Sequence, residues 1–223
     1  MNQQQRGLFI TFEGTEGSGK STQARLLAER LRGAGHPVIE SQEPGGTPIG
    51  MQIRRVLLDG ANRELMPTTE LLLMFAARAQ NVDQWIRPGL EAGKIIVSDR
   101  FTDSTLAFQG AGRGLGRELV LRVDAIACRG VKPDLTLCVT IDLDLGLERA
   151  QARNVETKAT ETRLDDEAVE FHRRASDEYR RLAHDEPERF KLVDGGRPLE
   201  AVATDVWAPV EPLLAIKQRF GGS

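Results

Sequence analysis

The chain of 223 residues is poor in the residues that build disulfide or metal scaffolds. Its two cysteines, Cys128 and Cys138, are too few for a disulfide framework and lack the spacing of a metal site. Both lie in apolar stretches, which favours small buried hydrophobic side chains. The three histidines, His36, His172 and His184, are scattered, and no two have the spacing of metal ligands.

Long apolar runs are missing as well. No stretch approaches the roughly 20 residues that cross a bilayer, and the first residues do not form a signal peptide. We therefore expect a soluble cytoplasmic protein without a membrane partner. The 30 Lys and Arg against 33 Asp and Glu give a net charge of −3, which argues against a protein that coats nucleic acid polymers.

Short apolar segments alternate with longer amphipathic ones along the chain. Strands are predicted at residues 8–13, 37–42, 94–99, 135–142 and 190–193. Helices are predicted at residues 20–33, 48–58, 68–92, 117–128, 143–153, 165–184 and 199–218. This alternation predicts an α/β fold in three layers, with a mostly parallel five-stranded sheet and helices on both faces. Because nothing divides the pattern, residues 1–223 are expected to form one domain.

The strongest motif is GTEGSGKS at residues 14–21, which matches G-x-x-x-x-G-K-[ST]. A chain of this length and composition matches it by chance roughly once in 200 cases. The motif follows a predicted strand that ends at Glu13 and opens a predicted helix, as a phosphate-binding loop (P-loop) requires. Its glycines let backbone N–H groups surround a polyphosphate, Lys20 reaches the β- and γ-phosphates, and the Ser21 hydroxyl ligates Mg²⁺. The sequence predicts a nucleoside triphosphate site on a P-loop NTPase fold.

Other motifs in the chain narrow the possible classes of P-loop protein. A GTPase would need D-x-x-G, which is absent, and the nearest guanine motif, VKPD at residues 131–134, precedes its strand and lacks the leading Asn or Thr. Asp99 ends a predicted strand at the sheet edge where ligands bind, where it would hold the metal or its water. Asp142 is a weaker alternative that a helix N-cap also explains.

Three other segments are candidates for an acceptor site. EPGGT at residues 43–47 allows close approach of a ligand, but alone it is only a turn. Phe75 and Arg78 share a helix face and could stack on a base and bond its edge, although a core phenylalanine and a surface arginine are the commoner explanation. DRFTDST at residues 99–105 is far more polar than a connection requires.

Together these segments resemble the bacterial thymidylate kinase family. The matching blocks are FEG (12–14), GKST (19–22), EPGGT (43–47), FAARAQ (75–80), DRF (99–101), ST (104–105), FQG (108–110) and KPDLT (132–136). They occur in the family's order, and other nucleotide kinases share only the P-loop. The resemblance implies phosphorylation of dTMP to dTDP in dTTP synthesis, with ATP as donor, Mg²⁺ as cofactor and a homodimer formed through helices that include the one bearing Phe75.

The resemblance also implies roles for individual residues. ATP would be held by Gly14, Thr15, Glu16, Gly17, Ser18, Gly19, Lys20, Ser21 and Thr22, and Mg²⁺ by Ser21 and Asp99. In the dTMP site, Arg54 and Arg100 would grip the phosphate. Near the sugar would lie Glu13, and Phe108 would pack under the sugar and disfavour a 2′-hydroxyl. At the base, Phe75 would stack on thymine, Arg78 would bond the carbonyl at base position 4, and Thr105 would approach the ring N–H. The same site would include Glu43, Pro44, Ser104 and Gln109.

The family has two arrangements of its catalytic arginine. The P-loop of this chain contains no arginine, so the resemblance implies the arrangement with the arginine in a lid, here residues 149–165. The polar, aperiodic residues 154–162 are expected to be the loop of that lid. Arg153 is favoured as the residue that meets the transferring phosphoryl group, with Arg163 as the alternative, and Arg149 is expected to pack on adenine.

The expected chemistry needs no general base, because a phosphate with a second pKa of about 6 is largely ionised at neutral pH. Alignment and neutralised charge are needed instead, and the expected catalytic set is Lys20, Arg100, Arg153 and Glu13. Two alternatives stay open on sequence alone. One is a kinase of another nucleoside or nucleotide, and the other is an ATP-binding switch, which would not need a second phosphate site at Arg54 and Arg100.

Overall fold

The structure is a computed structural model that describes residues 6–221, and side chains as far as residue 215. One sheet forms its centre, with strands β1 (Phe9–Glu13), β2 (Val38–Gln42), β3 (Ile95–Asp99), β4 (Leu135–Thr140) and β5 (Phe190–Asp194). The strands lie in the order β2-β3-β1-β4-β5, and every neighbouring pair is parallel. This confirms the predicted five-stranded parallel sheet.

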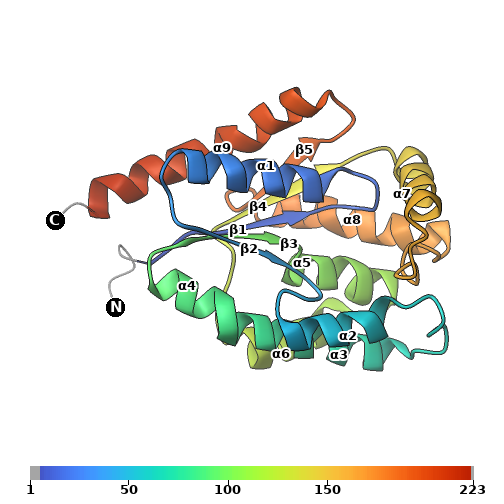
Figure 1. Cartoon of the computed structure of the whole chain (residues 1–223). Coiled ribbons are helices and arrows are strands. Elements are labelled where there is room, and N and C mark those ends of the chain that lie inside the picture. The colour runs from blue at the N-terminus through green and yellow to red at the C-terminus, as the bar shows by residue number, and fades with distance from the viewer. Residues whose placement is uncertain (1–5, 222–223) are drawn as a thin grey trace.

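Alternate residues of the central strands face opposite layers of helices. On β1, Ile10 and Phe12 pack with α1 (Lys20–Gly33) and α9 (Leu199–Gly221), whereas Phe9 packs into the core on the other face. Figure 1 shows α1 and α9 above the sheet and α2, α3, α4 and α6 below it. Because both faces are covered, β1 is buried along its whole length, as the apolar strand sequences predicted.

The second layer contains most of the other helices. They are α2 (Pro48–Leu58), α3 (Pro67–Asn81), α4 (Arg87–Glu91), α5 (Thr102–Thr105), α6 (Arg117–Cys128) and α8 (Val169–Asp185), with two π-helical segments, η2 (Val82–Ile86) and η3 (Leu106–Gly112). Helix α7 (Leu143–Thr157) follows β4, and its first turn lies against the loop after β1. Of the helices in residues 6–221, none has the length and apolar character that a membrane crossing requires.

Two regions differ from the sequence pattern. The expected helix at 68–92 is present but contains the π-helical turn η2, and residues 102–112 form α5 and η3, for which no element was predicted. This second segment begins with polar residues and ends with glycines. Its order comes from distant partners, because η3 packs against α8 and the amide of Phe101 donates to the Glu13 carboxylate at 2.8 Å.

The lid is more helical than expected. Helix α7 continues to Thr157, so the predicted loop at 154–162 is wrong for its first four residues, and α8 begins at Val169 rather than at residue 165. Residues 154–157 have no apolar period, but the amides of Lys158 and Ala159 close the last turn on the carbonyls of Val155 and Asn154. The lid arginine Arg153 is therefore held inside a helix.

Candidate active site

The P-loop connects β1 to α1 and is packed closely from two sides. Gly14 and Gly17 have positive φ angles of 135° and 68°. A Cβ atom on Gly14 would lie 2.2 Å from the Val139 carbonyl oxygen, and one on Gly17 would lie 2.1 Å from the Gly146 carbonyl oxygen. Both positions therefore require glycine. The second contact seats the loop on α7, the helix that carries Arg149 and Arg153.

Lys20 and Ser21 open α1 beside the end of β3. The Lys20 ammonium lies 3.4 Å from the Thr15 carbonyl oxygen, and burial and the neighbouring Arg100 lower its pKa. The Ser21 hydroxyl donates to Oδ2 of Asp99, while Oδ1 of Asp99 is buried without a hydrogen-bond partner among the described residues. A hydroxyl beside a carboxylate with a free oxygen fits Mg²⁺, which takes one or two protein oxygens and completes its shell with phosphates and water. Asp142, the alternative, caps α7 through the Leu145 amide.

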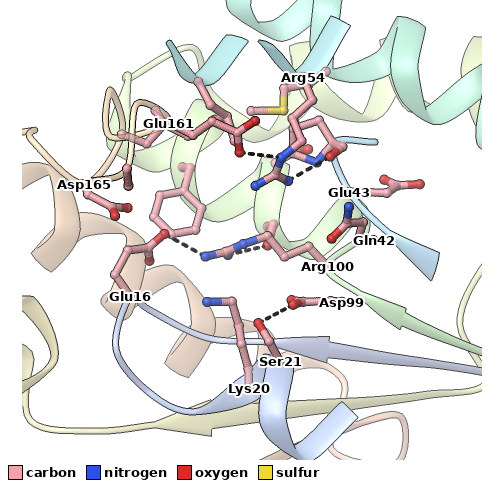
Figure 2. Close-up of a pocket in the computed structure, with 18 of the residues that line it drawn as sticks. Glu16, Lys20, Ser21, Gln42, Glu43, Arg54, Asp99, Arg100, Glu161 and Asp165 are labelled. Atoms are coloured by element: carbon pink, nitrogen blue, oxygen red, sulfur yellow. Dashed lines mark hydrogen bonds and ion pairs between the residues drawn. The ribbon is translucent and has the colours of Figure 1, made fainter. Parts of the chain in front are cut away.

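A cavity of about 310 Å³ extends from the P-loop to the lid. Figure 2 shows how side chains from the P-loop, α2, β3 and the lid converge on it. Of the residues predicted from the sequence it is lined by Glu16, Lys20, Ser21, Glu43, Pro44, Arg54, Arg78, Asp99, Arg100, Ser104, Thr105, Phe108, Gln109 and Arg153. The predicted residues outside its lining are Glu13, Gly14, Thr15, Gly17, Ser18, Gly19, Thr22, Phe75 and Arg149.

Arg100 lies at the centre of the cavity wall, in the unusual φ of 74°. Its guanidinium donates to the Gly14 carbonyl at 3.1 Å, the Ser104 hydroxyl at 2.9 Å and the Glu16 carboxylate at 2.8 Å. Burial disfavours ionisation of Glu16, but the charges of Arg100 and Lys20 outweigh it and hold the pKa of Glu16 below its ordinary value. The positive φ is thus fixed by contacts that join the P-loop to the end of β3.

Glu13, the last residue of β1, is fully buried behind Arg100. Its carboxylate accepts from the Ser104 hydroxyl and, at 3.2 Å, from the Tyr179 hydroxyl. Burial and the nearby Asp103 raise the pKa of Glu13 to about 7. Tyr179, on α8, also lies 3.3 Å from Arg100. Sequence reasoning missed Tyr179, and its only signal there is that it is the one tyrosine of the chain.

Acidic residues of the lid region pair with two other arginines of the cavity, and Figure 2 shows one of them, Glu161, turned toward Arg54. Arg54, on α2, donates from Nε to Glu161 at 2.8 Å and from Nη1 to the Pro44 carbonyl at 2.9 Å. Arg153 pairs with Asp165 at 3.0 Å. Sequence reasoning missed both acids, because a polar lid gives no signal for which of its carboxylates turn inward. Arg54 and Arg153, both predicted to meet phosphate groups, are therefore each paired with a carboxylate in this structure.

At the far end of the cavity, Arg78 is buried against Thr105. Its Nη2 donates to the Thr105 hydroxyl at 2.9 Å, so this arginine is not the surface residue that the commoner explanation assumed. Phe75 lies beneath it in the hydrophobic core, with the guanidinium 4.7 Å from the ring centroid. Phe108 lies against Arg100 at 4.9 Å. The stacking of Phe75 on a base stays a prediction.

The three lid arginines have different surroundings. Arg163 is buried, donating to the Leu57 carbonyl at 2.5 Å and to Glu70 at 2.7 Å, and it does not line the cavity. Arg149 is exposed on α7 and also lies outside the lining. Arg153 alone of the three lines the cavity. The geometry favours Arg153 for catalysis and makes Arg163 an anchor of the lid.

A P-loop at the carboxyl ends of a parallel sheet, facing a cavity with further arginines, defines the class of P-loop nucleotide kinases. A family model described as thymidylate kinase matches residues 12–206 of the chain. The thymidylate kinase of Pelobacter propionicus is 48% identical over 206 residues, covering 92% of this chain and 94% of its own. The thymidylate kinase of Geobacter sulfurreducens is also 48% identical, covering 90% and 94%.

The solved structures agree with the sequences. The crystal structure of thymidylate kinase from Ehrlichia chaffeensis superposes with a TM-score of 0.73 at 30% identity, covering 92% of this chain and 99% of that one. The chain belongs to the thymidylate kinase family, and it is a nucleoside monophosphate kinase.

Proposed function

We propose that the protein transfers the γ-phosphoryl group of ATP to dTMP, giving ADP and dTDP. The observation that carries this proposal is the position of Arg54 and Arg100 in one cavity with the P-loop residue Lys20. Two arginines opposite a triphosphate site suit an acceptor that itself bears a phosphate. A switch protein would not need this second anion site, and a nucleoside kinase would need a base for a hydroxyl nucleophile instead.

In the proposed reaction, a phosphate oxygen of dTMP attacks the γ-phosphorus, and the bond to the β,γ-bridging oxygen breaks to release ADP. Lys20 neutralises the phosphates of ATP, Arg54 and Arg100 hold the acceptor phosphate, and Arg153 meets the phosphoryl group in transit. Ser21 and Asp99 would hold Mg²⁺, which neutralises phosphate charge when bound. The Glu13 carboxylate, buried behind Arg100, keeps that guanidinium in place beside the sugar end of the site.

We propose that thymine binds at the end of the cavity lined by Arg78 and Thr105. Arg78 offers hydrogen-bond donors only, which suits the carbonyl at base position 4, and Thr105 beside it can meet the ring N–H. Phe75 would stack on the base, and Phe108, packed on Arg100, would lie under the sugar and disfavour a 2′-hydroxyl. We place Glu43, Pro44, Ser104 and Gln109 in the same site because they line it.

Two broader features belong to the same proposal. The enzyme would form a homodimer through α2, α3 and α6, which pack side by side below the sheet and carry exposed apolar residues, among them Val56, Leu72 and Ile126. A second copy would cover this surface. We also place the enzyme in the cytoplasm, where ATP and dTMP are available.

A coupled ADP-release assay tests the activity directly. With Mg·ATP, we expect ADP release to depend on dTMP and to be faster with dTMP than with dUMP, dGMP or thymidine. Lys20→Ala should lower the rate by at least about 100-fold while the fold stays intact. Lys94→Ala is the matched control, because this exposed lysine precedes β3 at the opposite end of the sheet.

Other outcomes would point to the alternatives. Faster transfer to thymidine than to dTMP would make the protein a nucleoside kinase. Slow ADP release that no acceptor accelerates would make it a switch. Near-normal activity of Lys20→Ala would contradict the assignment of the P-loop.

A further inference from the structure

Asn81, at the end of α3, is fully buried and does not line the cavity. Its Nδ2 donates to Oε1 of Glu43 at 3.0 Å and to the Ser41 hydroxyl at 2.8 Å. A Cβ on Gly46 would come within 2.9 Å of its Oδ1, so the absence of a side chain there leaves room for the amide. Both N–H donors of the buried amide are therefore used, one by the Glu43 carboxylate and one by the Ser41 hydroxyl, at the end of β2.

Glu43 connects this amide to Arg78. Its second oxygen, Oε2, accepts from Nε of Arg78 at 2.5 Å, and both side chains of this pair are buried. Burial raises the pKa of Glu43, and the hydrogen bonds from Arg78 and Asn81 oppose that rise. Asn81 therefore helps to keep the carboxylate ionised and correctly rotated for its pairing with the guanidinium.

Arg78 has few donors left after these contacts. Beyond the bond to Glu43, Nη2 donates to the Phe101 carbonyl at 3.0 Å and to Thr105 at 2.9 Å, and Nη1 reaches Thr102 at 3.5 Å. A guanidinium has five N–H groups. Among the described residues no acceptor meets the second hydrogen of Nη1, while the side chain lines the cavity.

We propose that Asn81 is a positioning residue that sets the base specificity of the site through Glu43 and Arg78. This rests on the proposed function, in which the cavity holds thymine. The one remaining donor of a fixed guanidinium donates to a carbonyl oxygen at base position 4, and it disfavours an amino group there, because two buried donors would face each other unpaired. A guanidinium free to rotate would lose that discrimination.

The test is the preference for dTMP over dCMP, measured as the ratio of kcat/KM values. In Asn81→Leu we expect KM for dTMP to rise about tenfold and the preference to fall about tenfold, with kcat within about twofold of wild type. Asn81→Asp should change both quantities in the same direction. It keeps the shape of asparagine but replaces the amide donor with a carboxylate oxygen that repels Glu43, so it answers the question if the leucine variant fails to fold.

The matched control is Gln80→Leu, which removes an amide from the same helix, where Gln84 is its one side-chain partner among the described residues. It should keep both the wild-type KM and the wild-type preference. Wild-type values in Asn81→Leu and Asn81→Asp would overturn the proposal, and so would an equal rise of KM for dTMP and dCMP, which marks a structural role. Absence of dTMP phosphorylation by the wild-type enzyme would instead overturn the proposed function.

Discussion

At the scale of single residues, the surroundings of the lid arginines distinguish roles that the sequence left open. Arg153 lines the cavity on α7, with more than half of its side chain exposed. We expect Arg153→Ala to lower kcat about 10³-fold while the Kd for dTMP stays within about twofold, because it would act on charge that develops in the transition state. Steady-state kinetics and calorimetric titration measure the two quantities.

Arg149→Ala is the control for this experiment, since Arg149 lies one turn earlier on the same helix and outside the cavity lining. Its loss should raise the KM for ATP a few-fold and leave kcat within about twofold. If Arg153→Ala changed only KM, the residue would belong to substrate binding instead.

Glu13 makes the folded protein sensitive to pH. Its pKa rises from 4.5 in the unfolded chain to about 7 in the folded protein, through burial and the neighbouring Asp103. Between these values the folded state binds more protons, so the stability that Glu13 contributes is present at low pH and is lost as pH rises through 7. Relative to wild type, Glu13→Gln should therefore gain about 2–3 kcal/mol of unfolding free energy between pH 5 and pH 8.

Urea unfolding of both proteins at several pH values measures this difference. Glu29→Gln, on the exposed face of α1, is the control and should track the wild type at every pH. Parallel stability curves for Glu13→Gln and wild type would show that the Glu13 carboxyl titrates at its ordinary pKa.

At the scale of elements, the contact between the lid and α2 is expected to weaken the binding of dTMP. Glu161 pairs with Arg54, one of the two arginines proposed to hold the dTMP phosphate, so that phosphate would have to displace a carboxylate. Both side chains are partly exposed, and such pairs contribute about 0.2–1 kcal/mol. We expect Glu161→Gln to lower the Kd for dTMP by up to about fivefold, as measured by titration calorimetry without ATP.

Glu156→Gln removes the same charge from an exposed position of the lid helix and should leave the Kd for dTMP at its wild-type value. An unchanged or weaker affinity in Glu161→Gln would show that Glu161 does not compete with the phosphate. A gain shared by both variants would reflect the net charge of the lid alone.

Elements whose order is local could be predicted, and those ordered by distant contacts could not. Helices α1, α2 and α6 begin and end at the predicted residues, because glycine, proline or a phosphate-binding turn marks their ends in the sequence. Residues 102–112 carry no such pattern, and they become helical against α8 and Glu13, which lie far away in the chain. The same reason explains why Tyr179 and Glu161 were missed, since only the folded lid and α8 bring them to the site.

At the scale of the whole molecule, the parallel sheet gathers the site at one edge. Glu13, Asp99 and Glu43 come from the ends of three adjacent strands or just beyond them. Strand order could not be read from the sequence, but the rule that ligands bind at the carboxyl ends of parallel strands was enough to predict Asp99 at this edge, whereas Glu13 and Glu43 were expected in the site only from the family resemblance. Glu43 and Asp99 both line the cavity at this edge.

The exposed outer face of the second helical layer, formed by α2, α3 and α6, bears on how the molecule assembles. Ile126 on α6 is 75% exposed, Leu72 on α3 is 54% exposed and Val56 on α2 is 48% exposed, an arrangement typical of a subunit interface. We expect light scattering after gel filtration to give twice the chain mass of 24.6 kDa for wild type and the monomer mass for Leu72→Glu, because a buried charge would oppose association. Val169→Glu, on α8 and 45% exposed, introduces the same charge outside this surface and should remain dimeric. A monomeric wild type, or dissociation by Val169→Glu alone, would show that α2, α3 and α6 are not the interface.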